Sequence, residues 1–179
     1  RNCFTDGDLY FNTGDLMRTL DVGFAYGQTH YAFVDRIGDT FRWKSENVST
    51  NEVGEIINNF SEVVSTNVYG VEIPGTDGRA GMAAIVFNDK VSSDHIDLGA
   101  LSEHINDNLP SYARPIFIRV LEELPTTTTH KLQKNQLRDQ AFHLDQVEEE
   151  LLVRDPFTGQ YRKLNSDFYD QIMRREIAF

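Results

Sequence analysis

The sequence has little cysteine, no long apolar run and no apolar opening segment. Cys3 is the one cysteine among 179 residues, so no internal disulfide forms and we expect a reducing compartment, the cytoplasm. The longest apolar run, Met82 to Phe87, has six residues, whereas a membrane-spanning helix needs about 20. The chain opens on polar residues from Arg1 rather than on Met or a secretory signal. We therefore expect a piece of a longer protein.

Basic residues are also scarce relative to acidic ones. The chain has 17 Lys and Arg against 28 Asp and Glu, a net charge of −11. Nucleic-acid binding is excluded on this ground, because a phosphate backbone is met by a net basic surface. One stretch opposes the trend: residues 114–138 hold five basic and two acidic residues. This stretch predicts a basic patch and a candidate anion site.

Several common catalytic motifs are absent. The sequence contains no GxSxG elbow, no GxGxxG loop and no Walker loop. The five histidines show neither HxxxH spacing nor a CxxC partner, so we expect no metal site in this chain.

The hydrophobic pattern predicts an α+β fold, with helices packed on a small sheet of about three central strands plus hairpins. The first 35 residues, rich in glycine turns, read as hairpins too few to bury a core alone. Beyond them we expect helices at 49–60, 97–109, 131–142 and from a Ser166 cap, strands at 63–73, 81–87 and 114–121, and a hairpin at 150–162.

Three clusters carry chemistry, and each has a structural alternative. The turn at 12–15 places the Asp15 carboxylate where it can accept hydrogen bonds from two vicinal hydroxyls, as acidic residues do with ribose. The alternative is that Asp15 only accepts hydrogen bonds from backbone amides of its own turn. The segment 35–39 places a glycine in a charged turn, which suits either a hinge or a plain β-turn. Lys131 and Lys134 open a helix, where the dipole disfavours cations. A bound phosphate or carboxylate would explain them, as would simple solvation.

Six ordered segments give these clusters a common reading. They are YFNTGDL at 10–16, FVDRIGDTFRWKSENVST at 33–50, VYGVEIPGTDGRAGMAA at 68–84, LPSYARPIFIR at 109–119, the lysine segment at 125–134 and DPFTGQYRKL at 155–164. Together they resemble the C-terminal part of the adenylate-forming superfamily, in its branch of fatty acid transport proteins and very-long-chain acyl-CoA synthetases. The resemblance covers nearly the whole chain.

The resemblance implies a role for each cluster. It implies that Asp15 and Arg36 bind the ribose of the adenylate and that Gly38 and Asp39 form a hinge. It implies that Lys131 is the adenylation lysine, which contacts the fatty-acid carboxylate and the phosphate. The loop then implied to line the coenzyme A tunnel consists of Trp43, Lys44, Ser45, Glu46 and Asn47.

The domain division follows from the same resemblance. Residues 1–35 would be the tail of a large N-terminal AMP-binding domain, and residues 36–179 the mobile lid, with the hinge at 35–39. The large domain would supply the phosphate loop, the acyl tunnel and the Mg²⁺ site. Without it, the 179 residues are expected to be inactive.

The implied reaction is that of a long- or very-long-chain fatty-acid–CoA ligase using ATP, Mg²⁺ and coenzyme A, releasing AMP and pyrophosphate through an acyl-adenylate. A bulky carboxylate such as a bile acid is an alternative substrate, and peripheral membrane association stays open. A non-catalytic α+β ligand-binding or interaction module is the alternative from another class.

Three departures from the superfamily pattern accompany the match. Ser45 stands where glycine is usual in the tunnel loop, and we expect its side chain to narrow the approach of the thiol arm. Residues 27–32 form a short insertion, and His130 replaces the glycine before the lysine.

Overall fold

The computed structural model describes residues 13–24, 27–36, 40–88, 95–125 and 134–179. A five-stranded sheet in the order β5-β6-β7-β8-β9 forms its centre. Its strands are β5 (Val63–Val71), β6 (Ala80–Phe87), β7 (Phe117–Leu121), β8 (Leu151–Arg154) and β9 (Tyr161–Lys163). Only β6 and β7 are parallel, and they are joined through α2 (Leu98–Asn108). The α+β expectation and the hairpin expected at 150–162 are confirmed.

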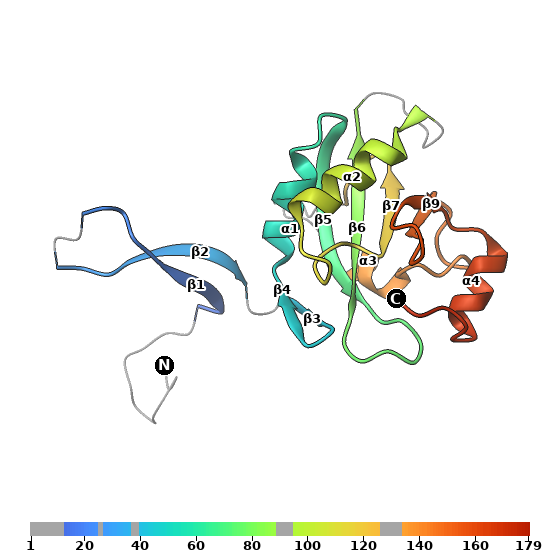
Figure 1. Cartoon of the computed structure of the whole chain (residues 1–179), viewed down its shortest axis with the longest axis horizontal. Helices are drawn as coiled ribbons and strands as arrows, with labels where there is room; N and C mark the ends of the chain where they lie inside the picture. The colour runs from blue at the N-terminus through green and yellow to red at the C-terminus, as the bar shows by residue number, and fades with distance from the viewer. Residues whose placement is uncertain (1–12, 25–26, 37–39, 89–94, 126–133) are drawn as a thin grey trace.

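Helices cover both faces of this sheet (Figure 1). Val68 on β5 faces Gly54 of α1 (Thr50–Asn58). Arg119 on β7 lies on the opposite face. Its register partner on β6 pairs in turn with Asn67 on β5, and Asn67 and Val68 are successive residues that point to opposite faces. Its guanidinium contacts Gln140 of α3 (Lys134–Gln140). The central strands are therefore buried on both sides, which explains their nearly continuous apolar sequences.

Helix starts follow their capping residues. Ser49 accepts the amide of Glu52 and Asp97 accepts the amide of Ala100, as the sequence predicts. The expected Ser166 cap is wrong by one residue. Asn165 caps α4 (Ser166–Met173) by accepting the Phe168 amide, because its extended backbone places its side chain over the first turn. The start of the helix expected from Lys131 lies partly outside the described residues, and α3 is described from Lys134.

Two small hairpins precede the sheet. β1 (Asp15–Leu20) pairs with β2 (His30–Arg36) and projects away from the rest of the molecule in Figure 1. β3 (Phe41–Trp43) pairs with β4 (Glu46–Val48). This second hairpin packs on the sheet, and it carries the whole loop predicted to contact coenzyme A.

Candidate functional site

Asp15 and Arg36 lie opposite each other in the β1–β2 hairpin. Their Cα atoms are register partners, at the beginning of β1 and the end of β2. The Arg36 Nε lies 3.8 Å from the Asp15 Oδ1, and both side chains are accessible, at 67% and 30% exposure. The structure thus brings together two residues separated by 20 others, and it leaves their polar groups available to a ligand. Both were implied to contact one ribose.

Asp35, the neighbour of Arg36, is buried and heavily hydrogen-bonded. The residue is only 1% exposed to solvent. Oδ2 accepts the Thr50 amide at 2.7 Å and the Ser49 hydroxyl at 3.1 Å, and Oδ1 accepts the Asn51 side-chain amide at 3.1 Å. A carboxylate at a helix N-terminus satisfies amides that have no partner within the helix. Asp35 therefore fixes the end of β2 to the start of α1.

The predicted tunnel loop is a tight hairpin turn. Lys44 and Ser45 connect β3 to β4, and both have positive φ, 50° and 69°. Positive φ at both central residues is the type I′ arrangement, in which glycine is favoured at the second position. The serine at position 45 therefore occupies a left-handed conformation that the glycine usual in the superfamily adopts without strain.

The side chains of this loop divide into two groups. Trp43 is 3% exposed and packs in the core, whereas Lys44, Ser45, Glu46 and Asn47 are exposed. Trp43 therefore anchors the turn to the core. The four exposed residues are the ones available to a ligand.

Phe41 and two glycines fix the β3–β4 hairpin to the sheet. Gly70 and Gly81 are register partners across β5 and β6, and they leave a slot for the Phe41 ring. A Cβ on Gly70 would lie 2.7 Å from Phe41 Cβ. At the neighbouring turn, Gly78 has φ +84°, and the Arg79 amide donates to the Arg42 carbonyl at 2.7 Å. Close backbone approach thus sets the position of the predicted coenzyme A loop.

The other predicted site residues lie outside the described residues. These are Gly38 and Asp39 of the hinge and Lys131. The structure does describe Lys134, three positions after Lys131. Its Nζ donates to Thr50 Oγ1 at 2.9 Å, so α3 is linked at its start to the same helix end that Asp35 anchors.

The expected basic patch is wrong for two of its five cations. Arg114 donates to the carbonyls of Asn106 and Leu109, at the end of α2. Arg119 is 4% exposed and forms an ion pair with Glu149 at 2.7 Å. Both guanidinium groups therefore donate to acceptors within the protein, Arg119 from a buried position and Arg114 from a half-buried one.

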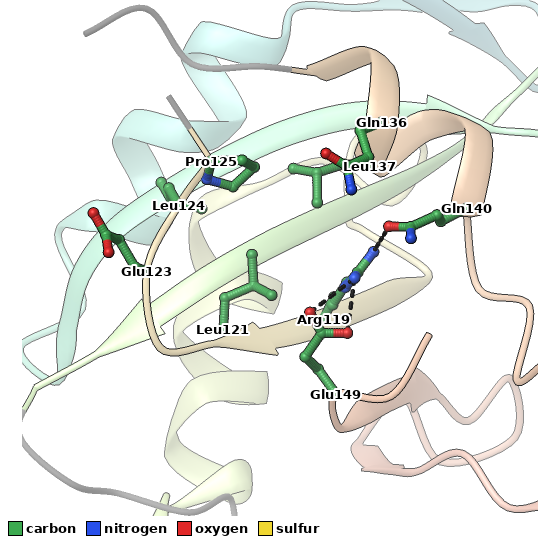
Figure 2. Close-up of a pocket in the computed structure, with 9 residues that line it drawn as sticks. All are labelled: Arg119, Leu121, Glu123, Leu124, Pro125, Gln136, Leu137, Gln140 and Glu149. Atoms are coloured by element: carbon green, nitrogen blue, oxygen red, sulfur yellow. Dashed lines mark hydrogen bonds and ion pairs between the residues drawn. The ribbon is translucent and has the colours of Figure 1, made fainter. Parts of the chain in front are cut away.

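A cleft of about 390 Å³ lies between β7, the segment after it and α3. Figure 2 shows Arg119 at one end, with hydrogen bonds to Gln140 and to both carboxylate oxygens of Glu149. Leu121, Leu124 and Leu137 contribute its apolar lining. Burial raises the pKa of the Glu149 carboxyl, but the hydrogen bonds and charge of Arg119, together with the backbone amides of Glu148 and Glu149, outweigh burial and hold that pKa below its ordinary value of 4.5.

Metal ligands do not gather in the part of the chain that the structure describes. There, no three His, Cys, Asp or Glu side chains lie close enough together to hold an ion. Two histidines serve other partners: His104 bonds the Ile56 carbonyl at 2.7 Å and His143 the Tyr169 hydroxyl at 3.1 Å. Across the same residues, no helix has the length and apolarity to cross a bilayer.

Asp35 and Arg119 are the residues whose roles the sequence did not reveal. The segment 35–39 was interpreted only as a turn or hinge, although its first residue is a buried anchor. Arg119 offered a signal, since it is a single charge inside the apolar run of β7, on the face it shares with Phe117. A charge at such a position requires a buried partner.

Comparisons with known proteins show which domain and which proteins this chain resembles. The AMP-binding enzyme C-terminal domain matches residues 52–131. Long-chain fatty acid transport protein 3 of Homo sapiens is 42% identical over 97% of this chain and 24% of its own length. The medium/long-chain-fatty-acid–CoA ligase FadD6 of Mycobacterium tuberculosis is 47% identical over 86% of this chain and 24% of its own.

Solved structures give the same result for the fold. The anthranilate CoA ligase AuaEII, in complex with anthranoyl-AMP, superposes with a TM-score of 0.62 at 25% identity, over 72% of this chain and 24% of its own. The chain thus spans about a quarter of the length of these relatives. Its fold is that of the C-terminal domain of adenylate-forming enzymes, and its homologues are fatty acid transport proteins and fatty-acid–CoA ligases.

Proposed function

We propose that this chain is the lid of a long- or very-long-chain fatty-acid–CoA ligase, and that it acts in two half-reactions. The observation that carries the proposal is the 47% identity to a medium/long-chain-fatty-acid–CoA ligase over 86% of the chain. In the first half-reaction, a carboxylate oxygen attacks the α-phosphorus of ATP and pyrophosphate leaves. In the second, the coenzyme A sulfur attacks the acyl carbon, its proton is lost, and AMP leaves.

Lys131 is the residue we assign to adenylation. One anion attacks another in that step, so a positive charge held near both lowers their repulsion as negative charge moves to the leaving pyrophosphate. A lysine ammonium is a compact point charge with three donors, which suits this role. The AMP-binding enzyme C-terminal domain match extends to this residue.

Asp15 and Arg36 are assigned to the adenylate ribose. A carboxylate accepts hydrogen bonds from both ribose hydroxyls, and a guanidinium donates to a ribose oxygen. Their placement opposite each other, with both side chains accessible, supports this assignment. The pair contributes binding and orientation in both half-reactions.

Mg²⁺ would be held by residues outside this chain. When bound to ATP it offsets charge on the phosphates. The described residues offer no set of three ligands for it, so we assign none of its contacts to this lid.

The second half-reaction requires the lid to turn, which is the role we assign to Gly38 and Asp39. Lys131 then leaves the active site. The turn between β3 and β4 moves in, and Lys44, Ser45, Glu46 and Asn47 line the path of the pantetheine arm. The rigid packing of this hairpin on the sheet supports the assignment, because such a loop moves as one body with the lid.

A large N-terminal domain of the same protein is the proposed partner, and we assign residues 1–35 to its tail and 36–179 to the lid. Exposed apolar side chains on the β1–β2 hairpin support this division, since such surfaces mark a contact. They include Met17, Tyr31 and Phe33, which are 47%, 61% and 51% exposed. A cytoplasmic location with peripheral membrane contact stays a prediction, as does the choice between a fatty acid and a bulky carboxylate.

The test is Lys131→Ala in the full-length enzyme, with the two half-reactions measured separately. ATP–pyrophosphate exchange with a fatty acid should fall by at least about 100-fold, the size of effect expected for one lost transition-state charge contact. Thioester formation from supplied acyl-adenylate and coenzyme A should change little. Equal loss in both half-reactions would contradict the role of Lys131. Absence of both reactions in the wild-type protein would favour a non-catalytic module.

A further inference from the structure

Among the described residues, six hydrogen bonds join the end of β2 to the start of α1. The Asp35 Oδ2 accepts from the Ser49 hydroxyl at 3.1 Å, from the amide and hydroxyl of Thr50 at 2.7 and 3.2 Å, and from the Asn51 amide at 3.3 Å. The Asn51 side-chain amide donates to the Asp35 Oδ1 at 3.1 Å and to the Val34 carbonyl at 3.4 Å. Asp35 and Thr50 are 1% and 3% exposed. Charge-assisted bonds that are shielded from water are among the stronger polar contacts in a protein.

Apolar packing contributes little to this junction. Asp35 is the one buried residue of β2, and its neighbour Phe33 is 51% exposed. The buried apolar residues of α1, Val53 and Ile57, belong to the core that α1 forms with the sheet. A cleft of about 300 Å³, lined by Phe33, Val34, α1 and β5, lies at the same junction. A small, polar contact of this kind permits its two sides to move relative to each other.

The six bonds span the boundary between the two proposed parts of the protein. Asp35 ends the segment assigned to the large domain, whereas residues 49–51 belong to the lid. A turn of the lid about Gly38 and Asp39 moves the start of α1 relative to the end of β2. Hydrogen bonds require donor–acceptor distances near about 3 Å, so a displacement of a few ångströms breaks all six. The bonds therefore exist in one orientation of the lid and not in the other.

We propose that Asp35 is a positioning residue that holds the lid in one of its two orientations and thereby sets the balance between the two half-reactions. The inference rests on the proposed function, which assigns the turning of the lid to Gly38 and Asp39. Asp35 acts on the lid rather than on a reactant. Its carboxylate binds α1 in the orientation of this structure and releases α1 when the lid turns. Loss of the carboxylate favours the other orientation, because a contact made in one state biases the equilibrium between the two.

The experiment compares three alanine variants of the full-length enzyme. Asp35→Ala removes the acceptor of five of the six bonds. Asn51→Ala removes the two side-chain bonds and keeps α1, since alanine is the best helix former. Asp97→Ala is the matched control: the Asp97 carboxylate caps α2 by accepting the Ala100 amide at 2.9 Å, so its bond lies within the lid. A thermal melt checks that each variant folds.

The two half-reactions are measured separately, by ATP–pyrophosphate exchange and by thioester formation from supplied acyl-adenylate and coenzyme A. We expect Asp35→Ala to change the ratio of the two rates by about 10-fold, within the usual range for coupling between two states. Asn51→Ala should change it in the same direction by about threefold, as fewer bonds are lost.

The direction of the changes distinguishes this role from a structural one. One half-reaction should be faster in Asp35→Ala than in wild type, because its orientation of the lid gains population, whereas a structural defect slows both. Asp97→Ala should leave the ratio unchanged. A parallel fall of both half-reactions in Asp35→Ala, or a ratio equal to that of Asp97→Ala, overturns the inference.

A second readout reports the orientation of the lid without catalysis. Dyes attached through Thr19→Cys on β1 and Asp167→Cys on α4 lie on exposed positions on the two sides of the hinge. Single-molecule energy transfer should show a second population that grows in Asp35→Ala and not in Asp97→Ala. If the wild type shows neither half-reaction but the populations shift, the proposed function is wrong and the role of Asp35 in holding the lid stands. If both half-reactions occur and the populations do not shift, the role of Asp35 alone is wrong.

Discussion

The β1–β2 hairpin and the five-stranded sheet treat their large apolar side chains in opposite ways. Among the described residues, six of the nine exposed large hydrophobics lie between Leu16 and Phe33, in or beside the hairpin. The sheet instead buries apolar residues on both faces. The difference indicates that the sheet and its helices bury a core of their own, while the hairpin leaves its apolar side chains exposed. Asp35 stands at the junction, with its carboxylate bound to α1.

A large effect on stability should come from filling the glycine slot in the sheet. Gly70→Ala places a Cβ 2.7 Å from Phe41, so the ring must move and the β3–β4 hairpin shifts with it. Overpacking of this kind costs about 1–3 kcal/mol, which chemical denaturation measures. Gly54→Ala in α1 is the matched control. Its Cβ meets Val68 at an ordinary 3.8 Å, so stability should not fall. An equal loss of stability in the two variants would contradict the claim that Gly70 leaves space for the Phe41 ring.

A second large effect should come from removing the anchor at the junction. Asp35→Ala leaves the first amides of α1 without the buried carboxylate, and a hydrogen bond to a charged group contributes about 1.5–3 kcal/mol. We expect a loss of that size in the free energy of unfolding. Asp15→Ala is the control, because its pair with Arg36 is exposed and exposed pairs contribute about 0–1 kcal/mol. If Asp15→Ala lowers the free energy of unfolding as much as Asp35→Ala, the buried hydrogen bonds of Asp35 do not stabilise the junction as proposed.

The Arg119–Glu149 pair should make the sheet unit sensitive to acid. The Glu149 pKa is lowered in the folded state, so its contribution to stability is complete above the ordinary value of 4.5 and is lost as the pH falls through the folded pKa. We expect the melting temperature of the wild type to fall below pH 4.5. Glu149→Gln should lower the melting temperature at pH 7 and flatten that decline. An unchanged slope would show that other carboxylates control the loss of stability in acid, such as Asp155, whose pKa is also lowered, by the amides of Phe157 and Thr158 and by Arg162.

The smallest effect should come from removing the hairpin. Deletion of residues 1–34 keeps Asp35 and the whole sheet, and the described side chains that it removes are mostly exposed. The melting temperature should change by no more than about 2 °C, since loss of exposed contacts costs under about 0.5 kcal/mol. Deletion of 164–179 is the contrast, because it removes the buried Phe168 and Ile172 and should unfold the protein. A hairpin deletion that unfolds the chain would contradict the division into two regions.

The sequence predicted the elements that depend on local pattern. Alternation and 3.6-residue periodicity located the central strands and α1 and α2, and the Ser49 and Asp97 caps were correct because capping is decided within four residues. The Ser166 cap was wrong because two adjacent residues can both cap, and the backbone at Asn165 decides between them.

Features that depend on distant contacts could not be predicted in the same way. The basic stretch at 114–138 seemed a surface patch, but the partners of Arg114 and Arg119 lie on α2, α3 and the segment at Glu149. The slot at Gly70 and Gly81 exists only after β5 and β6 pair in register. The pair of Asp15 and Arg36 was implied by family resemblance alone, and strand register explains why the two residues meet.

The measurement that tests the central claim most directly is ATP–pyrophosphate exchange by the 179-residue chain, alone and fused to the large N-terminal domain of a fatty-acid–CoA ligase. The chain alone should show no exchange above background, because the phosphate loop and acyl tunnel lie in the proposed partner. The fusion should show fatty-acid-dependent exchange that Lys131→Ala abolishes. Exchange by the chain alone would contradict its role as a lid.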